Sequence, residues 1–175
     1  MASNPHLISA QDLVVAADHG QIYIFSAAAG LFDDIWMPVL EDAWESDRFV
    51  GVLPGFIDLL TPGQWNFQTP LRLEVWSAEP ADDRNDWDHE VDVDFDVPDG
   101  RISFQPSGGS SHFTSAEVPA GTYRARVSGR GFTEVGHAGA DGDDSYRLRL
   151  WPGGEPAAPV LRKRWPGRDR PGMKP

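Results

Sequence analysis

The sequence predicts a mostly β protein, an antiparallel β-sandwich of the jelly-roll type that carries one short amphipathic helix. From residue 69 onward, short runs rich in β-branched and aromatic residues alternate with clusters of Gly, Pro and Asp, at a spacing typical of sandwiches. The length of 175 residues suits a single domain. The chain has 7 Trp and 9 Phe, which supply large side chains for a core, so it is expected to fold.

The N-terminal region predicts a hairpin, a helix and a further strand pair. Residues 13–17 and 21–25 are β-prone and flank the turn 18–20, which predicts a hairpin; the second run is apolar on both faces, as a central strand is. Residues 33–47 place apolar side chains at helical spacing, with an Asp available as N-cap and a Pro near the first turn. Residues 49–60 carry Gly and Pro between apolar runs, which predicts a strand, a sharp turn and a short second segment.

The remainder of the chain predicts a succession of strands and a tail. The strand candidates are residues 71–76, 91–97, 102–105, 113–118, 122–127 and 146–151. The last two form a hairpin around the long Gly- and Asp-rich loop 129–145. Prolines recur beyond Trp151, so this end is expected to be extended, partly disordered and unable to build a sheet. We predict an acidic β-sandwich domain over residues 1–155 and a flexible, basic, Pro-rich tail over residues 156–175.

Net charge narrows the class of partner. The formal charge is −12, although residues 162–175 are net positive, so the body of the chain is strongly acidic. Such a surface repels nucleic acid, which argues against direct nucleic-acid binding by the body, and it attracts proteins with a basic surface. A purely solubilising role for the acidity stays open. The tail is expected to be solvated, with nucleic acid, an anionic membrane or the acidic body as the alternatives.

The sequence also bears on the compartment. Residues 1–20 lack the basic start and the apolar core of a secretory signal, and no apolar run approaches the roughly 20 residues that span a bilayer. The absence of Cys fits a reducing environment. We therefore expect a cytoplasmic protein with no membrane partner.

An acidic residue stands at every second position across residues 86–96. In a strand this period places the carboxylates on one face, with Val and Phe side chains on the other. We expect the acidic face to lie in solvent and to meet Lys and Arg of a partner. A merely solvated face, or an edge guarded against aggregation, is the competing interpretation. The predicted partner-binding residues are Asp88, Glu90, Asp92, Asp94 and Asp96, with Trp87 as an exposed anchor.

Motifs for metals and cofactors are missing from the sequence. A calcium loop would need Gly where Val97 stands, and an extended strand spreads its ligands too far for one ion. The acidic run 141–144 lacks the closing Glu of a calcium loop, because Pro152 takes its place. The histidines have no zinc spacing, and His89 is expected to be an ordinary surface residue. We predict no metal and no cofactor.

The order of several segments resembles the competence-system nuclease inhibitor family, small bacterial proteins that bind and restrain a DNA-entry nuclease. The segments that carry the resemblance are residues 18–25, a helix around Trp44, and residues 91–102, 118–124 and 144–148. Together they span residues 11–151. The resemblance implies a β-rich fold and an inhibitor or immunity role. The basic tail and the long Gly-rich loop depart from the family pattern, so the identity of the partner stays open.

These observations favour a non-enzymatic protein-binding module, an inhibitor or immunity protein whose partner has a basic surface and for which a nuclease is a candidate. Two other classes stay open. One is a hydrolase that uses Asp94 and Asp96 with His89. The other is a structural or small-molecule-binding β domain, with a cavity beside Trp36, Trp44 or Trp76.

Overall fold

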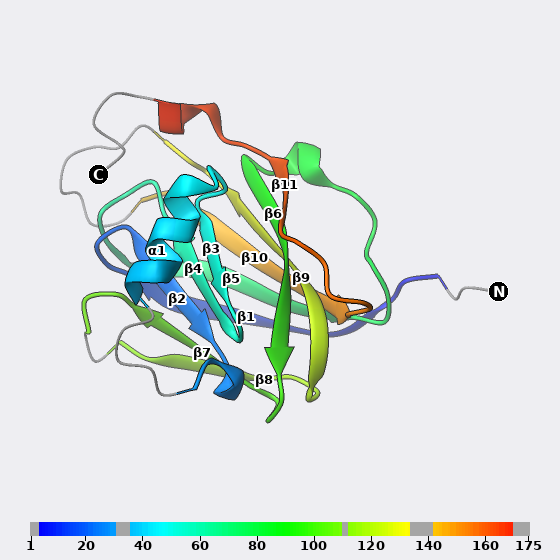
Figure 1. Cartoon of the computed structure of the whole chain (residues 1–175). Coiled ribbons are helices and arrows are strands. Elements are labelled where there is room, and N and C mark those ends of the chain that lie inside the picture. Colours follow the sequence, from blue (N-terminus) through cyan, green and yellow to red (C-terminus); the bar gives the residue numbers. More distant parts are fainter. Residues whose placement is uncertain (1–3, 31–35, 110–111, 134–141, 170–175) are drawn as a thin grey trace.

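The structure, a computed structural model, describes residues 4–30, 36–109, 112–133 and 142–169 (Figure 1). Its strands form a six-stranded sheet in the order β1-β5-β10-β9-β6-β11 and a five-stranded sheet in the order β3-β4-β2-β7-β8. β5 and β10 run parallel, and the other described neighbours run antiparallel. The predicted mostly β sandwich with one helix is confirmed.

The element boundaries follow the alternating apolar runs of the sequence. The six-stranded sheet contains β1 (Leu7–Ala17), β5 (Asn66–Trp76), β10 (Ser145–Pro152), β9 (Gly121–Arg130), β6 (His89–Val97) and β11 (Val160–Lys163). The five-stranded sheet contains β3 (Val50–Leu53), β4 (Phe56–Leu60), β2 (Gln21–Phe25), β7 (Arg101–Pro106) and β8 (Thr114–Glu117). The helices are α1 (Trp36–Glu45) and the short 3₁₀ helices η1 (Ala27–Ala29), η2 (Arg84–Asp86) and η3 (Pro166–Asp169).

The core lies between the two sheets. On β6, Val91, Val93 and Phe95 are at most 1 % exposed, and they belong to one apolar cluster with Ile22 and Ile24 of β2 in the other sheet. Successive side chains of a strand point to opposite faces, so one apolar residue in every two fills the space between the sheets. The intervening residues of β6 therefore face away from the core.

The predicted hairpin of residues 13–17 and 21–25 is wrong, although both runs are strands. β1 pairs with β5 in one sheet, whereas β2 pairs with β4 and β7 in the other. His19 and Gly20 have φ angles of 50° and 72°, so the tight turn exists, but it carries the chain from one sheet to the other. A local turn signal does not determine which strands pair beyond it. β2 lies in the middle of its sheet, which confirms the predicted central strand.

Helix α1 confirms the helix predicted within residues 33–47 and packs on the outer face of β3 and β4, as Figure 1 shows. Val39 and Ala43 are fully buried, in agreement with the predicted spacing. The approach is closest at Gly51 of β3, where a Cβ would come within 1.8 Å of the Val39 carbonyl oxygen. Only glycine allows this contact. The proposed N-caps, Asp33 and Asp34, lie outside the described residues.

The prediction that the chain beyond Trp151 builds no sheet is wrong for Val160–Lys163. These residues form β11, an edge strand that pairs antiparallel with β6. Pro159 stands immediately before the strand and Pro166 lies beyond it, so neither removes a donor from the ladder. Residues 170–175, the end of the predicted flexible tail, lie outside the described residues.

The connection between β5 and β6 covers part of the six-stranded sheet. These strands follow one another along the chain, but β10 and β9 lie between them in the sheet. Residues 77–88, here called the crossover segment, therefore pass over the outer face of β10 and β9. Asp83 of this segment lies 2.8 Å from Arg147 and 2.7 Å from Arg149 of β10. This face of the sheet is thus partly covered by the chain itself.

Candidate functional site

The predicted acidic face exists on β6, but only one of its ends is open to solvent. Glu90, Asp92, Asp94 and Asp96 share the face opposite the core. Glu90 is 0 % exposed and Asp92 is 5 % exposed. By contrast, the side chain of Asp94 is 38 % exposed, and Asp96 is exposed. The expectation that the whole row lies in solvent is therefore wrong for Glu90 and Asp92.

Arginines on the neighbouring strands explain how these acids can be buried. We call the outward-facing arginines of β5, β9 and β10 the arginine layer; they are Arg72, Arg124, Arg126, Arg130, Arg147 and Arg149. Arg126 is 0 % exposed and stands directly opposite Asp92 in the β6–β9 register. Its Nε lies 2.6 Å from Asp92 Oδ1 and its Nη2 lies 2.8 Å from Oδ2. Such a bidentate pair offsets the cost of taking two charges out of water.

Glu90 is held by a second set of groups. The hydroxyl of Ser128 donates to Glu90 Oε2 at 2.7 Å, and the Nε of Arg162 donates to Oε1 at 3.3 Å. Arg149 Nη2 lies 3.7 Å from Oε2. Because Arg162 belongs to β11, the basic tail supplies part of the positive charge around this acid. The expectation of a solvated tail is therefore wrong at Arg162, and the alternative contact with the acidic body is observed.

Burial and pairing shift the pKa of the arginines in opposite directions. Burial by itself would lower the pKa of Arg126, but the hydrogen bonds and negative charge of Asp92, together with Glu79 and Glu90, raise it above its ordinary value. Burial lowers the pKa of Arg149. Arginine nevertheless remains protonated in proteins. The layer is therefore a fixed set of cations into which the acids of β6 fit.

The predicted anchor Trp87 is also buried. It is 6 % exposed, and the guanidinium carbons of Arg130 and Arg147 lie 4.9 Å and 4.4 Å from the centre of its ring. The interpretation of Trp87 as an exposed anchor is therefore wrong. Its neighbour Asp88 accepts a hydrogen bond from the backbone N–H of Phe132 at 3.0 Å, so this carboxylate holds the start of the loop after β9.

The structure does not bring together the groups of the proposed hydrolase. His89 points to the opposite face of β6 from Asp94 and Asp96, because its position has the other parity. His89 is 3 % exposed, so the expectation of a surface histidine is wrong. Its Nδ1 accepts a hydrogen bond from the backbone N–H of Trp165 at 3.2 Å. Among the described residues, no group of three or more His, Cys, Asp or Glu could hold a metal ion.

The exposed end of the acidic face borders a groove with a volume of about 430 Å³. We call it the acidic groove; it is lined by Asp42, Arg48, Val52, Leu53, Pro54, Gly55, Asp94, Asp96 and Pro159. One wall comes from α1, β3 and the turn after it, and the other comes from β6 and the tail. The sequence pattern places Asp42 on the polar side of its helix. It contains no signal that joins Asp42 to Asp94, because the two elements meet only through folding.

The carboxylates of the acidic groove differ in how far they are already paired. Asp42 lies 2.5 Å from Arg48, and Asp94 lies 2.8 Å from Arg124. Among the described residues, the carboxylate of Asp96 has neither a hydrogen-bond nor an ion-pair partner. Asp96 is thus the acid of β6 that an outside cation can approach at the lowest cost.

A different buried acid lies beneath helix α1. Asp58 of β4 pairs with Gly51 and Tyr23 in the register and shares their outward face. It is 0 % exposed, and among the described residues neither of its carboxylate oxygens has a hydrogen-bond partner. Burial raises its pKa well above the usual range. Burial, aided by the charge of Asp58, also raises the pKa of Tyr23 to about 12. Burial at this position therefore favours the protonated form of Asp58 over the ionised form.

The comparisons with known proteins concern the fold. No family model and no curated protein matches the chain. Similar solved structures include ComJ of Bacillus subtilis, an inhibitor of the DNA-degrading activity of NucA, with a TM-score of 0.54 and 18 % identity over 86 % of this chain and 100 % of ComJ. The crocagin biosynthetic gene J product has a TM-score of 0.53 and 17 % identity, over 82 % of this chain and 97 % of its own.

At these identities the likeness shows the fold alone. Among the described residues, no helix has both the length and the apolar character of a membrane span. Of the segments that carried the sequence resemblance, the one around Trp44 lies in α1, whereas residues 18–25 and 91–102 lie in strands and the turns that join them. The chain therefore has the fold of a structurally characterised nuclease inhibitor, as the resemblance predicted.

Proposed function

We propose that this chain is a non-enzymatic inhibitor or immunity module that binds a basic, nuclease-like protein through its acidic groove. The observation that carries the proposal is the free carboxylate of Asp96, beside Asp94 and Asp42, in a body of strongly acidic sequence. The similarity to the fold of ComJ supports the inhibitor role and the nuclease class of partner. Of the predicted partner-binding residues, we therefore retain Asp94 and Asp96. The other four make contacts within the protein itself; they are Asp88, Glu90, Asp92 and Trp87.

The chemistry of the groove suits a Lys or Arg side chain. Val52, Leu53 and Pro54 offer apolar surface for the alkyl stem, while Asp96 and Asp94 offer carboxylates for the charged end. Long-range attraction between the acidic body and a basic partner speeds their encounter, and salt weakens it. We therefore expect fast association that slows steeply as ionic strength rises.

Pull-down from the host followed by mass spectrometry identifies the partner, and association kinetics then test the groove. The double variant D94N/D96N should slow association with the captured protein about tenfold at low salt and raise the concentration needed to inhibit its nuclease activity. Asp86→Asn is the matched control, because Asp86 is exposed and lies outside the groove. Equal association rates for both variants and the unmodified chain would exclude the groove as the interface.

A further inference from the structure

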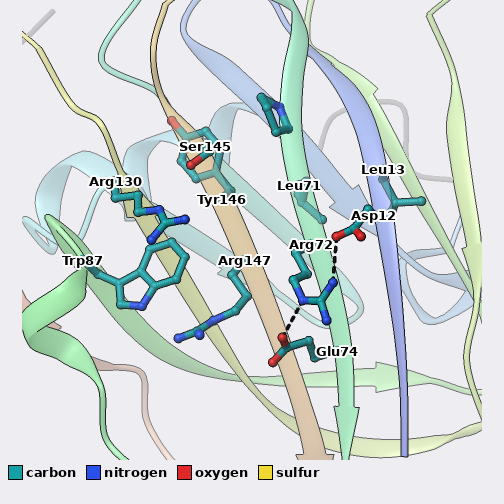
Figure 2. A pocket seen from close by; sticks show the side chains of 11 residues that line it. Asp12, Leu13, Leu71, Arg72, Glu74, Trp87, Arg130, Ser145, Tyr146 and Arg147 are labelled. Carbon is teal, nitrogen blue, oxygen red and sulfur yellow. Dashed lines mark hydrogen bonds and ion pairs between the residues drawn. The ribbon is translucent and has the colours of Figure 1, made fainter. Parts of the chain in front are cut away.

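A second groove, of opposite character, lies on the outer face of the six-stranded sheet. Its volume is about 510 Å³, and we call it the arginine groove. Arg72, Arg130 and Arg147 contribute guanidinium groups to its lining, together with Trp87, Ser145 and Tyr146. Figure 2 shows Trp87, Arg130 and Arg147 gathered on one side and Arg72, with Asp12 and Glu74, on the other. A cationic site of this kind is unexpected on a chain with a net charge of −12.

Arg130 differs from the other members of the arginine layer. Each of the others has a carboxylate within ion-pair distance; the pairs are Arg72 with Glu74, Arg124 with Asp94, Arg126 with Asp92, and Arg147 and Arg149 with Asp83. Arg130 is exposed and has no carboxylate partner among the described residues. Its guanidinium instead lies over the ring of Trp87. One cation of the layer is thus left for a ligand.

Arg147 adds unused donors beside Arg130. Its Nη2 donates to Asp83 at 2.8 Å, but in the part of the chain that the structure describes its buried Nε has no hydrogen-bond partner. Its guanidinium lies over the same indole as that of Arg130. The ring therefore holds two guanidinium groups in place before any ligand arrives, which lowers the entropic cost of binding. Ser145, opposite Arg130 in the β9–β10 register, adds a hydroxyl to this side.

The far side of the groove sets the charge that a ligand can carry. Arg72 is clamped between Glu74 and Asp12, each at 2.8 Å, so its charge is already compensated. Asp12 and Glu74 repel a second negative charge there. The groove therefore suits one singly charged anionic group at the Arg130 side better than a doubly charged phosphate.

We propose that the arginine groove binds a carboxylate group, held by the guanidinium groups of Arg130 and Arg147. Guanidinium matches a planar carboxylate in a two-bond geometry, and the volume lies in the range of small-molecule sites. The carboxylate belongs either to a free small acid or to a Glu or Asp side chain of a bound protein. This site is separate from the acidic groove and attracts the opposite charge, so it stands whether or not the proposed inhibitor function does.

Titration followed by ¹H–¹⁵N NMR tests the site, with choline chloride holding the ionic strength constant. Propionate and N-acetylglutamate amide, each with a single carboxylate, are the two carboxylate probes, and inorganic phosphate is the comparison anion. We expect saturable shifts of the Trp87 indole N–H and of the Arg130 amide with either carboxylate. Tighter binding of propionate would indicate a free acid, and tighter binding of the glutamate derivative would indicate a protein side chain. Non-saturating shifts, or stronger binding of phosphate than of both carboxylates, would overturn the proposal.

Substitutions assign the effect to Arg130. R130Q should weaken carboxylate binding about tenfold or more, because it removes a charged donor that is preorganised on Trp87. R101Q is the matched control, since Arg101 is an exposed arginine at the start of β7, outside the groove. Thermal unfolding checks that both variants stay folded. Equal affinity of R130Q and the unmodified chain would overturn the assignment.

Discussion

The outer faces of the two sheets both bury carboxylates, but they do so in opposite ways. On the six-stranded sheet, Asp92 and Glu90 lie against Arg126, Arg162 and a serine hydroxyl, so each of these acids has cations and hydrogen-bond donors beside it. On the five-stranded sheet, the carboxylate of Asp58 lies under α1 with no hydrogen-bond partner in the described segments, and burial raises its pKa. The two buried acids thus differ in their neighbours across the strand: Arg126 stands opposite Asp92, whereas Tyr23 and Gly51 stand opposite Asp58.

The largest effect on stability is expected from breaking the ion pairs of the six-stranded sheet. Arg126→Met should lower the free energy of unfolding by about 3–5 kcal/mol, because it removes the bidentate partner of buried Asp92 and leaves that acid only the longer contact with Arg162, at 3.3 Å. Urea denaturation monitored by tryptophan fluorescence measures this loss. The double variant R126M/D92N should recover part of it, since the stranded charge is then removed as well. A loss below about 1 kcal/mol in R126M would show that water reaches these acids.

Substitution of the buried acid on the five-stranded sheet should change stability in the opposite direction. Asp58→Asn should raise the free energy of unfolding at pH 7 by about 1–3 kcal/mol, because an unpaired buried carboxyl is replaced by a neutral group of the same shape. A raised pKa means that the folded state holds its proton more tightly than the unfolded state does. Stability is then lost as pH rises from the unfolded pKa through the folded pKa.

The pH dependence provides the check on Asp58. The difference in unfolding free energy between D58N and the unmodified chain should be small at pH 4 and should grow as pH rises. Subtracting the two curves removes the contribution of the other acids, which both proteins share. A difference that does not vary with pH would mean that Asp58 is ionised or neutral alike in both states.

A smaller effect on stability is expected where β11 contacts the buried acids of β6. Arg162→Gln should cost about 1–2 kcal/mol, because the side chain is largely buried and its bonds to Glu90 and Asp92 are long, at 3.3 Å each. Lys163→Gln, in the same strand, is the control and should change stability by less than about 0.5 kcal/mol. Thermal unfolding of both variants measures the difference. Equal losses would show that strand pairing, and not charge, holds β11 in place.

Local patterns in the sequence predicted the elements well and their surroundings poorly. The period of two in residues 91–97 correctly placed Val91 and Phe95 inside and the acids on the other face. Whether that other face meets water depends on the crossover segment and on β11, which cover it from distant parts of the chain. One signal in the sequence indicates that this face is covered. Arg124 and Arg126, and likewise Arg147 and Arg149, stand two positions apart, as the acids of β6 do, and carry the opposite charge.

The arginine layer also bears on how the chain avoids wrong arrangements of its strands. Two ion pairs on this face join distant residues: Asp92 and Arg126 of the layer are 34 positions apart, and Glu90 and Arg162 of β11 are 72 positions apart. The chain must close loops of this length before the charged partners can meet. We therefore expect these ion pairs to form after the strands have aligned. A sheet assembled in another order would bury acids with no guanidinium beside them, at a cost of several kcal/mol. The ion pairs therefore destabilise a sheet with a wrong strand order more than they stabilise the correct one.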